Sequence, residues 1–349
     1  MRETMKAIVL KSFGGPEVLD TVSEIPVPTP AADEVLVRVR TCGVCYLDTI
    51  VRSGVRPGTP IPHILGHEIC GDVVELGDHV QGLAVGVRVA TTYRGVCGHC
   101  YYCRNGTSVS CTNVRSPGVD RDGGYADFVS LQASSCVPVP PGVTDEAASI
   151  AGCVLGAVYR GVRVKARIQP GDTVLVTGAG GGAGLHAVQL AKLAGGYVLA
   201  RTTSPQKELM IREAGADEIL LGEDRDVIEQ VRQITGGRGA GVVLDCVGKA
   251  TASISLRSLA RGGRLVFVGE LGTEPMRVSI ARMLYRETEI HGVASPDSGE
   301  LWSLLELIAR GQVRPIVTEQ LPLERAADAH RMLAERANVG RIVLRAVTV

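Results

Sequence analysis

The stretch VLVTGAGGGAGLHAVQLAK, residues 174–192, decides the fold. Its first three residues are apolar, glycines follow after Thr177, and after Ala183 apolar side chains recur near helical spacing. A strand that turns through glycines into a helix lets a pyrophosphate approach the helix N-terminus. A glycine turn can also serve packing alone, so the flanking strand and helix are what favour a dinucleotide site. The predicted backbone contacts are Ala179, Gly181, Gly182 and Gly184.

Strand-like and helical segments alternate after residue 150. Near-continuous apolar strands separated by helices predict an α/β domain with a parallel, doubly wound sheet. Before residue 150, short apolar segments separated by Gly, Pro and Asp predict a β-rich domain, to which a last strand at 341–344 could return. The predicted parallel strands are 173–177, 197–201, 218–221, 242–246, 265–268 and 289–293.

The residues after the second parallel strand bear on the choice of cofactor. NAD sites place an acidic side chain there, and a carboxylate would repel the 2′-phosphate of NADP. Here Arg201, Thr202, Thr203 and Ser204 are followed by Lys207, with no acid among residues 200–204. These side chains favour NADP(H), although Arg201 could be a surface residue and Ser204 a helix cap. Gly269, after the fifth strand, is a further predicted cofactor contact.

Composition excludes several classes of partner. Lys and Arg total 37, Asp and Glu total 37, and no basic stretch is segregated, which argues against nucleic acid or an anionic membrane as the main partner. Scattered cations such as Arg115 and Arg121 are expected to be solvated. The N-terminal apolar run is too short for a signal peptide and no window reaches the ~18 apolar residues that a membrane-spanning helix needs, so we expect a cytoplasmic protein.

Four thiols lie within fifteen residues as Cys97-x2-Cys100-x2-Cys103-x7-Cys111. In a reducing compartment such spacing favours a structural zinc over disulfides or unrelated buried thiols. Four thiolates would fill a tetrahedron and leave no position for substrate. We therefore expect a stabilising lobe over about residues 94–112 that takes no part in the chemistry.

A second, sparser constellation could bind a catalytic metal. Cys45, His67 and Cys153 would supply two thiolates and an imidazole with one open position, and Glu68 could be an exchangeable fourth ligand or a nearby base. Sequence distance makes this pattern weak by itself. A His beside a Glu is more often structural, and a buried Cys is usually an apolar filler.

Taken together, these motifs resemble the zinc-containing medium-chain dehydrogenase/reductases, the alcohol dehydrogenase family, over essentially the whole chain. The resemblance rests on the four-cysteine lobe, Gly66-His67-Glu68, Cys45 followed by Asp48, Cys153 and the glycine turn, in the family's order. It implies a GroES-like catalytic domain, residues 1–153 and 295–349, and a Rossmann cofactor domain, residues 154–294.

The same resemblance implies roles for individual residues. Cys45, His67 and Cys153 would bind the catalytic zinc with Glu68 nearby, giving two zincs per chain. Asp48 would accept a hydrogen bond from His67, and Arg341 would lie near the cofactor pyrophosphate. A homodimer or homotetramer is implied, often formed through the last strand of the Rossmann sheet, here 289–293.

The implied reaction is the interconversion of a small-molecule alcohol with an aldehyde or ketone by hydride transfer, the carbonyl being polarised by zinc. Two residues depart from the family pattern: Leu47 replaces a Ser or Thr and Ile50 a His of its proton relay, leaving water, a ribose hydroxyl, Tyr46 or His63 as proton donors. The alternative is reduction of an activated C=C, because the chain is also similar to acryloyl-CoA reductases and quinone oxidoreductases. A non-catalytic protein with this fold is a third hypothesis.

Overall fold

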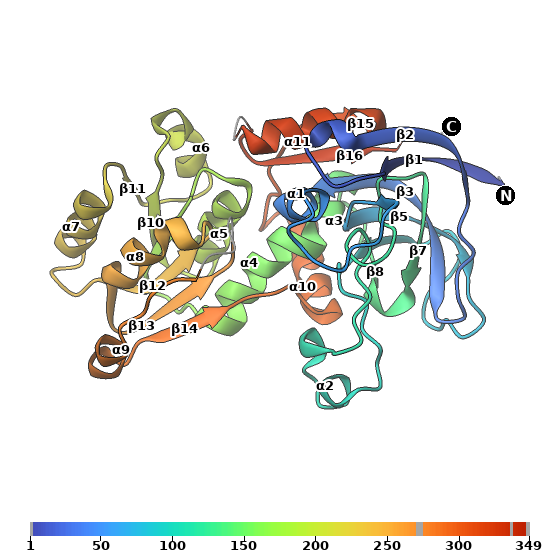
Figure 1. Ribbon diagram of the computed structural model, residues 1–349. Helices are drawn as coiled ribbons and strands as arrows, with labels where there is room; N and C mark the ends of the chain where they lie inside the picture. The colour runs from blue at the N-terminus through green and yellow to red at the C-terminus, as the bar shows by residue number, and fades with distance from the viewer. Residues whose placement is uncertain (1–2, 270–274, 336–337, 347–349) are drawn as a thin grey trace. The chain divides into compact units, whose positions relative to one another are not determined.

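The computed structural model describes residues 3–269, 275–335 and 338–346, and the chain divides into two units. One unit comprises residues 1–156 with 295–349, and the other comprises residues 157–294. The second unit is therefore inserted into the first along the chain. Each is described separately below (Figure 1).

The inserted unit is built on a parallel sheet in the order β11-β10-β9-β12-β13-β14. Its strands are β9 (Thr173–Thr177), β10 (Tyr197–Arg201), β11 (Glu218–Leu220), β12 (Ala240–Asp245), β13 (Leu259–Phe267) and β14 (Glu289–Gly292). Its helices are α5 (Gly182–Leu193), α6 (Glu208–Glu213), α7 (Asp224–Ile234), α8 (Lys249–Ser258) and α9 (Ile280–Arg286). This strand order is that of a doubly wound dinucleotide-binding sheet, which confirms the predicted fold class.

The predicted strands of this sheet agree with the observed ones to within two residues, except at β13. That strand begins at Leu259, six residues before the predicted start at 265, and its pairing with β12 shifts register around Gly262 and Gly263. The polar, glycine-rich start of β13 conceals it from an apolar pattern, because glycine carries no side chain to pack.

The first unit is β-rich, as predicted. Its larger sheet runs β15-β16-β3-β5-β6-β8 with β7 also paired to β3, and a smaller sheet runs β2-β1-β4. The strands are β1 (Thr4–Leu10), β2 (Leu19–Pro26), β3 (Glu34–Val44), β4 (His63–Ile64), β5 (Glu68–Leu76), β6 (Arg88–Thr91), β7 (Phe128–Gln132), β8 (Cys136–Pro138), β15 (Val317–Pro322) and β16 (Arg341–Arg345). The helices are α1 (Tyr46–Arg52), α2 (Tyr101–Arg104), α3 (Asp145–Ile150), α10 (Ser298–Ala309) and α11 (Ala326–Ala334).

A continuous helical run, residues 145–166, carries the chain from the first unit into the second. It begins at the N-cap Thr144, whose side chain accepts a hydrogen bond from the backbone of Ala147, and contains two π-helical turns, Ala151–Leu155 and Gly161–Ala166. The α4 helix (Gly156–Arg160) lies between those turns. By length and composition this run could span a membrane, but 72% of its apolar window is buried inside the protein, as in the core helix of a globular domain.

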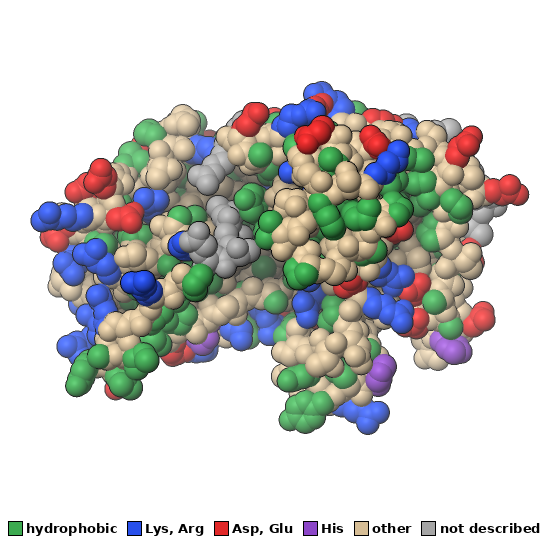
Figure 2. All heavy atoms as spheres, in the orientation of Figure 1, with side chains coloured by type: hydrophobic (Ala, Val, Ile, Leu, Met, Phe, Trp, Pro, Cys, Tyr) green, Lys and Arg blue, Asp and Glu red, His purple; other side chains and the backbone are tan. Residues whose placement is uncertain are grey.

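Charge on the surface is mixed. On the face shown in Figure 2, basic and acidic side chains occur over both units, and basic side chains are more frequent toward the left edge. Arg115 is exposed, as expected, whereas Arg121 is half-buried, and both bond to the buried carboxylate of Glu34, at 3.4 and 2.6 Å. The sequence could not show this, because the three residues lie on separate segments.

Candidate metal and cofactor sites

The four-cysteine lobe brings its thiols together. The Sγ atom of Cys100 lies 3.5 Å from that of Cys103 and 3.8 Å from that of Cys111. The Sγ atoms of Cys111 and Cys97 are 3.6 Å apart. Four sulfurs at about 2.3 Å from a zinc ion sit about 3.8 Å apart along the edges of a tetrahedron. All four thiols are free, and His99 is exposed and outside the group. The residues therefore fit a closed, structural zinc site.

The second constellation also converges. One ligand atom each from Cys45, His67, Glu68 and Cys153 lies within 4.8 Å of all the others. Cys45 caps the N-terminus of α1, Glu68 begins β5 with His67 directly before it, and Cys153 lies in the π-helical turn at Ala151–Leu155. Residues 108 positions apart thus meet at one point of the first unit.

Close backbone packing holds Cys153 in place. A Cβ atom added at Gly152 would lie 1.6 Å from the carbonyl oxygen of Thr91, the last residue of β6. Only glycine allows the helical run to approach β6 so closely. The π-helical turn, a feature often found at functional sites, then presents the next side chain, Cys153, to the cluster.

Asp48 orients His67, as the family resemblance implied. Its Oδ1 lies 2.8 Å from His67 Nδ1, and its Oδ2 accepts the backbone N–H of Cys45 at 2.9 Å. Burial by itself raises the pKa of Asp48, but its contacts with His67 and with the N–H of Cys45 outweigh burial and lower that pKa. An ionised Asp48 accepts a hydrogen bond from the Nδ1–H of His67, which leaves the Nε2 lone pair of His67 available to a metal.

Glu68 is paired with Arg341 across the middle strand of the sheet. Glu68 begins β5 and Arg341 begins β16, the two strands that flank the end of β3, and Arg341 Nη2 donates to Glu68 Oε2 at 2.5 Å. Both side chains are buried. Burial raises the pKa of Glu68 to about 7 although the guanidinium of Arg341 opposes it. A second cation beside the carboxylate would favour its charged form.

Two buried polar atoms test whether a metal fits here. Among the described residues, neither His67 Nε2 nor Glu68 Oε1 has a hydrogen-bond partner. A buried polar atom without a hydrogen-bond partner destabilises the folded state. An imidazole nitrogen and a carboxylate oxygen are both common zinc ligands, and the thiols of Cys45 and Cys153 lie in the same cluster. The four residues therefore fit a zinc ion that would satisfy both atoms.

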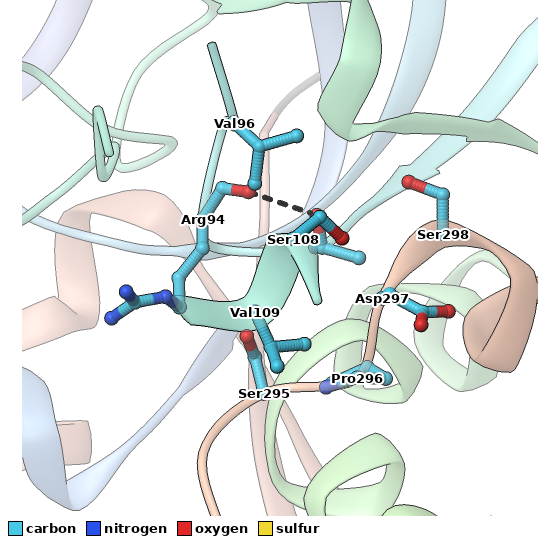
Figure 3. A pocket seen from close by; sticks show the side chains of 9 residues that line it. Arg94, Val96, Ser108, Val109, Ser295, Pro296, Asp297 and Ser298 are labelled. Carbon is cyan, nitrogen blue, oxygen red and sulfur yellow. Dashed lines mark hydrogen bonds between the residues drawn. The ribbon is translucent and has the colours of Figure 1, made fainter. Parts of the chain in front are cut away.

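Tyr93 and a polar pocket lie on the same unit. The ring of Tyr93 meets the ring of His67 edge-on, with centroids 5.3 Å apart. The pocket begins one residue before Tyr93 and is lined by Thr92, Arg94, Val96, Ser108, Val109 and Ser295–Ser298 (Figure 3). Two of its buried atoms, Arg94 Nε and Ser295 Oγ, have no hydrogen-bond partner among the described residues. The pocket thus offers polar atoms to a small polar group.

The glycine turn has the predicted form. Gly178 follows β9 with a φ of +66°, Gly181 caps α5, and α5 starts at Gly182. A Cβ at Gly184 would lie 2.1 Å from the carbonyl oxygen of Gly178, so glycine is required for the helix to pack against the turn. This is the geometry that lets a pyrophosphate approach a helix N-terminus.

The predicted phosphate-binding residues lie around this turn, and some of them already have partners within the unit. Arg201, the last residue of β10, donates from Nη2 to Asp224 Oδ1 at 3.1 Å. Thr202 is buried and accepts the backbone N–H of Ser204 at 3.1 Å. The side chain of Lys207 lies over Gly180, 2.8 Å from where a Cβ there would stand. Gly269 packs against the backbone of Cys246 beyond β12.

Sequence reasoning missed three residues of the metal site. The hydroxyl of Tyr125 donates to Asp48 Oδ2 at 3.2 Å and also lies 3.2 Å from Nε2 of His330. The other ring nitrogen of His330, Nδ1, lies 2.9 Å from a guanidinium nitrogen of Arg52. All three side chains are buried. Their contacts span up to 278 positions, so no local pattern could have found them.

Comparison with known proteins identifies the class. Residues 31–141 match the family model of the alcohol dehydrogenase GroES-like domain, and residues 182–310 match that of the zinc-binding dehydrogenases. The chain belongs to the zinc-containing medium-chain dehydrogenase/reductases, a family of oxidoreductases that use a nicotinamide cofactor.

The relatives that this chain resembles carry the names of two different enzyme activities. The acryloyl-coenzyme A reductase of Metallosphaera sedula is 35% identical, over 97% of this chain and 99% of its own length. The NAD-dependent alcohol dehydrogenase of Sulfurisphaera tokodaii is 32% identical, over 97% of this chain and 99% of its own. The crystal structure of a protein called AibC superposes with a TM-score of 0.94 at 40% identity, covering 100% of this chain and 97% of that one.

Proposed function

We propose that this protein is a zinc-containing reductase that uses NADPH to reduce an activated C=C bond, with a 2-enoyl thioester as the class of substrate. The observation that carries the proposal is the side chain at position 47. Leu47 is partly buried and packs against the apolar core of its unit, where an alcohol dehydrogenase would present a hydroxyl. Similarity to acryloyl-coenzyme A reductases supports the same choice.

The reaction adds a hydride to the β-carbon and a proton from water to the α-carbon, and oxidises NADPH to NADP⁺. Bound zinc would supply a Lewis acid for the charge that builds on the thioester oxygen, and bound NADPH the hydride. Cys45, His67 and Cys153 would hold the cation, while Asp48 orients His67 and Arg341 restrains Glu68. Because the product proton is delivered to carbon, the reaction needs no hydroxyl relay from position 47.

Interconversion of an alcohol with an aldehyde or ketone is the second candidate. It is favoured by the complete ligand set of Cys45, His67, Glu68 and Cys153, and by similarity to alcohol dehydrogenases. From sequence alone it ranks first. The apolar surroundings of Leu47 and the similarity to two acryloyl-coenzyme A reductases reverse that order.

Oxidation of NADPH in the presence of crotonyl-CoA, acryloyl-CoA and short aldehydes, followed at 340 nm, separates the two candidates. We expect turnover of the thioesters only. With 4-deuterated NADPH, deuterium should appear at C3 of the acyl product and a solvent proton at C2. Turnover of aldehydes alone, with deuterium at C1, would contradict the proposal and support the second candidate.

The variant Leu47→Ser provides a matched test of the proton path. Under the proposal it supplies a hydroxyl that the reaction does not need, so reduction of the thioester should change by less than about threefold. An increase in alcohol oxidation of about tenfold or more, within the range of general acid–base effects, would instead show that the missing relay limits the enzyme.

We further propose that NADP(H) is preferred to NAD(H). Arg201 and Lys207 lie at the end of β10 and over the glycine turn, and residues 200–204 contain no acid. Replacing Lys207 by Met should lower kcat/KM for NADPH by about tenfold and leave NADH unchanged. Lys192→Met, which removes a lysine of α5 paired with Asp217 at 2.6 Å, is the control. Equal loss with both cofactors would contradict this preference.

We propose that the two units have different roles. Residues 154–294 would bind the dinucleotide, and residues 1–153 with 295–349 would bind two zincs per chain. Thiolates hold zinc only while reduced, which supports a cytoplasmic location. Two zincs per chain would support catalysis, whereas one zinc would support the structural lobe alone and the non-catalytic alternative.

A homodimer through the edge of the parallel sheet is proposed as well. β14 is an edge strand, and beside it α9 exposes Ile280, Leu284 and Tyr285, each more than two-thirds exposed. Such neighbouring apolar side chains are typical of a surface covered by another copy. Light scattering should give a dimer or tetramer for the wild type and a smaller species for Leu284→Glu; a monomeric wild type would contradict the proposal.

A further inference from the structure

A continuous line of buried hydrogen bonds runs from the metal site to the far end of α1. It passes from His67 to Asp48, to the hydroxyl of Tyr125, to the imidazole of His330 and to the guanidinium of Arg52, with donor–acceptor distances of 2.8, 3.2, 3.2 and 2.9 Å. We name the residues Arg52, His330, Tyr125 and Asp48 the orienting chain. None is more than 7% exposed.

The chemistry of Arg52 sets the direction of every bond in this line. A guanidinium only donates, so Nδ1 of His330 must accept and its proton must be on Nε2. Nε2 then donates to the oxygen of Tyr125, and the Tyr125 proton is left to donate to Asp48 Oδ2. Asp48 Oδ1 accepts a hydrogen bond from the Nδ1–H of His67. Nε2 of His67 is then unprotonated and its lone pair is available to a metal.

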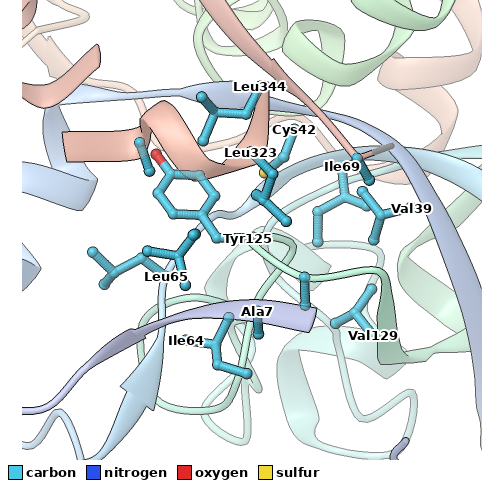
Figure 4. Packing of buried hydrophobic residues seen from close by; sticks show 14 of the residues in the cluster. Ala7, Val39, Cys42, Ile64, Leu65, Ile69, Tyr125, Val129, Leu323 and Leu344 are labelled. Carbon is cyan, nitrogen blue, oxygen red and sulfur yellow. The ribbon is translucent and has the colours of Figure 1, made fainter. Parts of the chain in front are cut away.

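The surroundings preserve this order. Burial lowers the pKa of His330 to about 4, so its imidazole is neutral at physiological pH. Arg52 is fixed on its other side by a bond from Nε to the carbonyl oxygen of Gly14 at 3.1 Å. Tyr125 belongs to a buried apolar cluster with Leu65, Val129 and Leu344, and its ring meets the ring of His330 edge-on (Figure 4).

We propose that Arg52, His330 and Tyr125 are positioning residues for the zinc ligand His67, because the orienting chain fixes its tautomer from a donor outside the metal site. Without Arg52 the imidazole of His330 could carry its proton on Nδ1 and accept from Tyr125, and Asp48 would lose a donor. This inference rests on the metal site of the proposed function and goes beyond the direct contact between Asp48 and His67.

The test is the rate at which zinc leaves the holoprotein for the chelator 4-(2-pyridylazo)resorcinol. Zinc from the four-cysteine lobe is the internal standard, since the release phase lost in Cys111→Ser belongs to the lobe. Tyr125→Phe, His330→Leu and Arg52→Met should each speed release from the other site by about tenfold, the lower end of the effect of outer partners on metal sites. Release from the lobe should be unchanged.

One conservative variant distinguishes orientation from general loosening. In His330→Gln the amide oxygen can accept from Arg52 and the amide nitrogen can donate to Tyr125, so release should stay within about threefold of wild type. Val129→Ala removes apolar packing from the cluster that also contains Tyr125, without changing a polar member of the orienting chain. It should lower the melting temperature yet leave zinc release unchanged.

Three results would overturn the inference: wild-type release rates in Tyr125→Phe and His330→Leu, equally fast release from His330→Gln and His330→Leu, or equally fast release from Val129→Ala. A protein that holds this zinc but reduces no thioester or aldehyde contradicts the proposed function and leaves the inference standing. A wild type with zinc in the lobe alone contradicts both.

Discussion

Replacing Gly152 by Ala should remove the catalytic metal while leaving the fold in place. The added Cβ would lie 1.6 Å from the carbonyl oxygen of Thr91, whereas such contacts are essentially never under 3.0 Å, so the backbone must move by at least 1.4 Å. Cys153 is the next residue. A zinc–sulfur bond tolerates deviations of about 0.2 Å, so the required movement exceeds that tolerance several-fold.

The expected result is one zinc per chain instead of two, measured by plasma mass spectrometry, with hydride transfer reduced at least about 100-fold. Gly161→Ala is the matched control, because it lies in the same helical run and a Cβ there would meet nothing closer than 3.5 Å. That variant should keep both zincs and full activity. A Gly152→Ala protein with two zincs and wild-type turnover would refute the reasoning.

Three further predictions concern the lobe, a buried carboxylate and the cofactor. Cys111→Ser should release the lobe zinc and lower the melting temperature while surviving protein stays active; unchanged zinc content would contradict the lobe assignment. Burial alone raises the pKa of Glu34, but bonds from Arg121, Ser130 and the N–H of Ala31 outweigh it and hold the pKa at about 2. Its ionised form therefore stabilises the fold fully above about pH 4.5, and this stabilisation is lost as pH falls toward 2; Glu34→Gln should cost about 1–2 kcal/mol at pH 7, limited by solvent screening, roughly half of that at pH 3, and little at pH 2, as measured by urea unfolding. Asp224→Ala frees Arg201 and should lower the KM for NADPH about two- to fivefold without affecting NADH, and an equal change for NADH would contradict the role of Arg201.

Local patterns were sufficient to predict the parallel sheet and the lobe. The strands at 173–177 and 197–201 are apolar runs whose ends coincide with the observed β9 and β10, because strands covered on both faces need continuous apolar side chains. The four cysteines lie within one loop, so their spacing alone predicts that they meet. Neither inference required knowledge of distant contacts.

The second metal cluster needed more than spacing. Cys45, His67 and Cys153 meet only because β3, β5 and β6 pair and the helical run packs against Thr91, and the family resemblance supplied that information. The orienting chain could not be predicted from the sequence, because Arg52 and His330 lie on separate helices and an arginine is ordinarily assigned to the surface. Similarly, Arg201 could not be seen to pair with Asp224 on another element.

Zinc content per chain in the wild type and in Cys153→Ser tests the central claim most directly, because that substitution removes one ligand of the second cluster and none of the lobe. We expect two zincs in the wild type and one in the variant, with hydride transfer lost. One zinc in both proteins, or two in both with activity retained, would contradict the account.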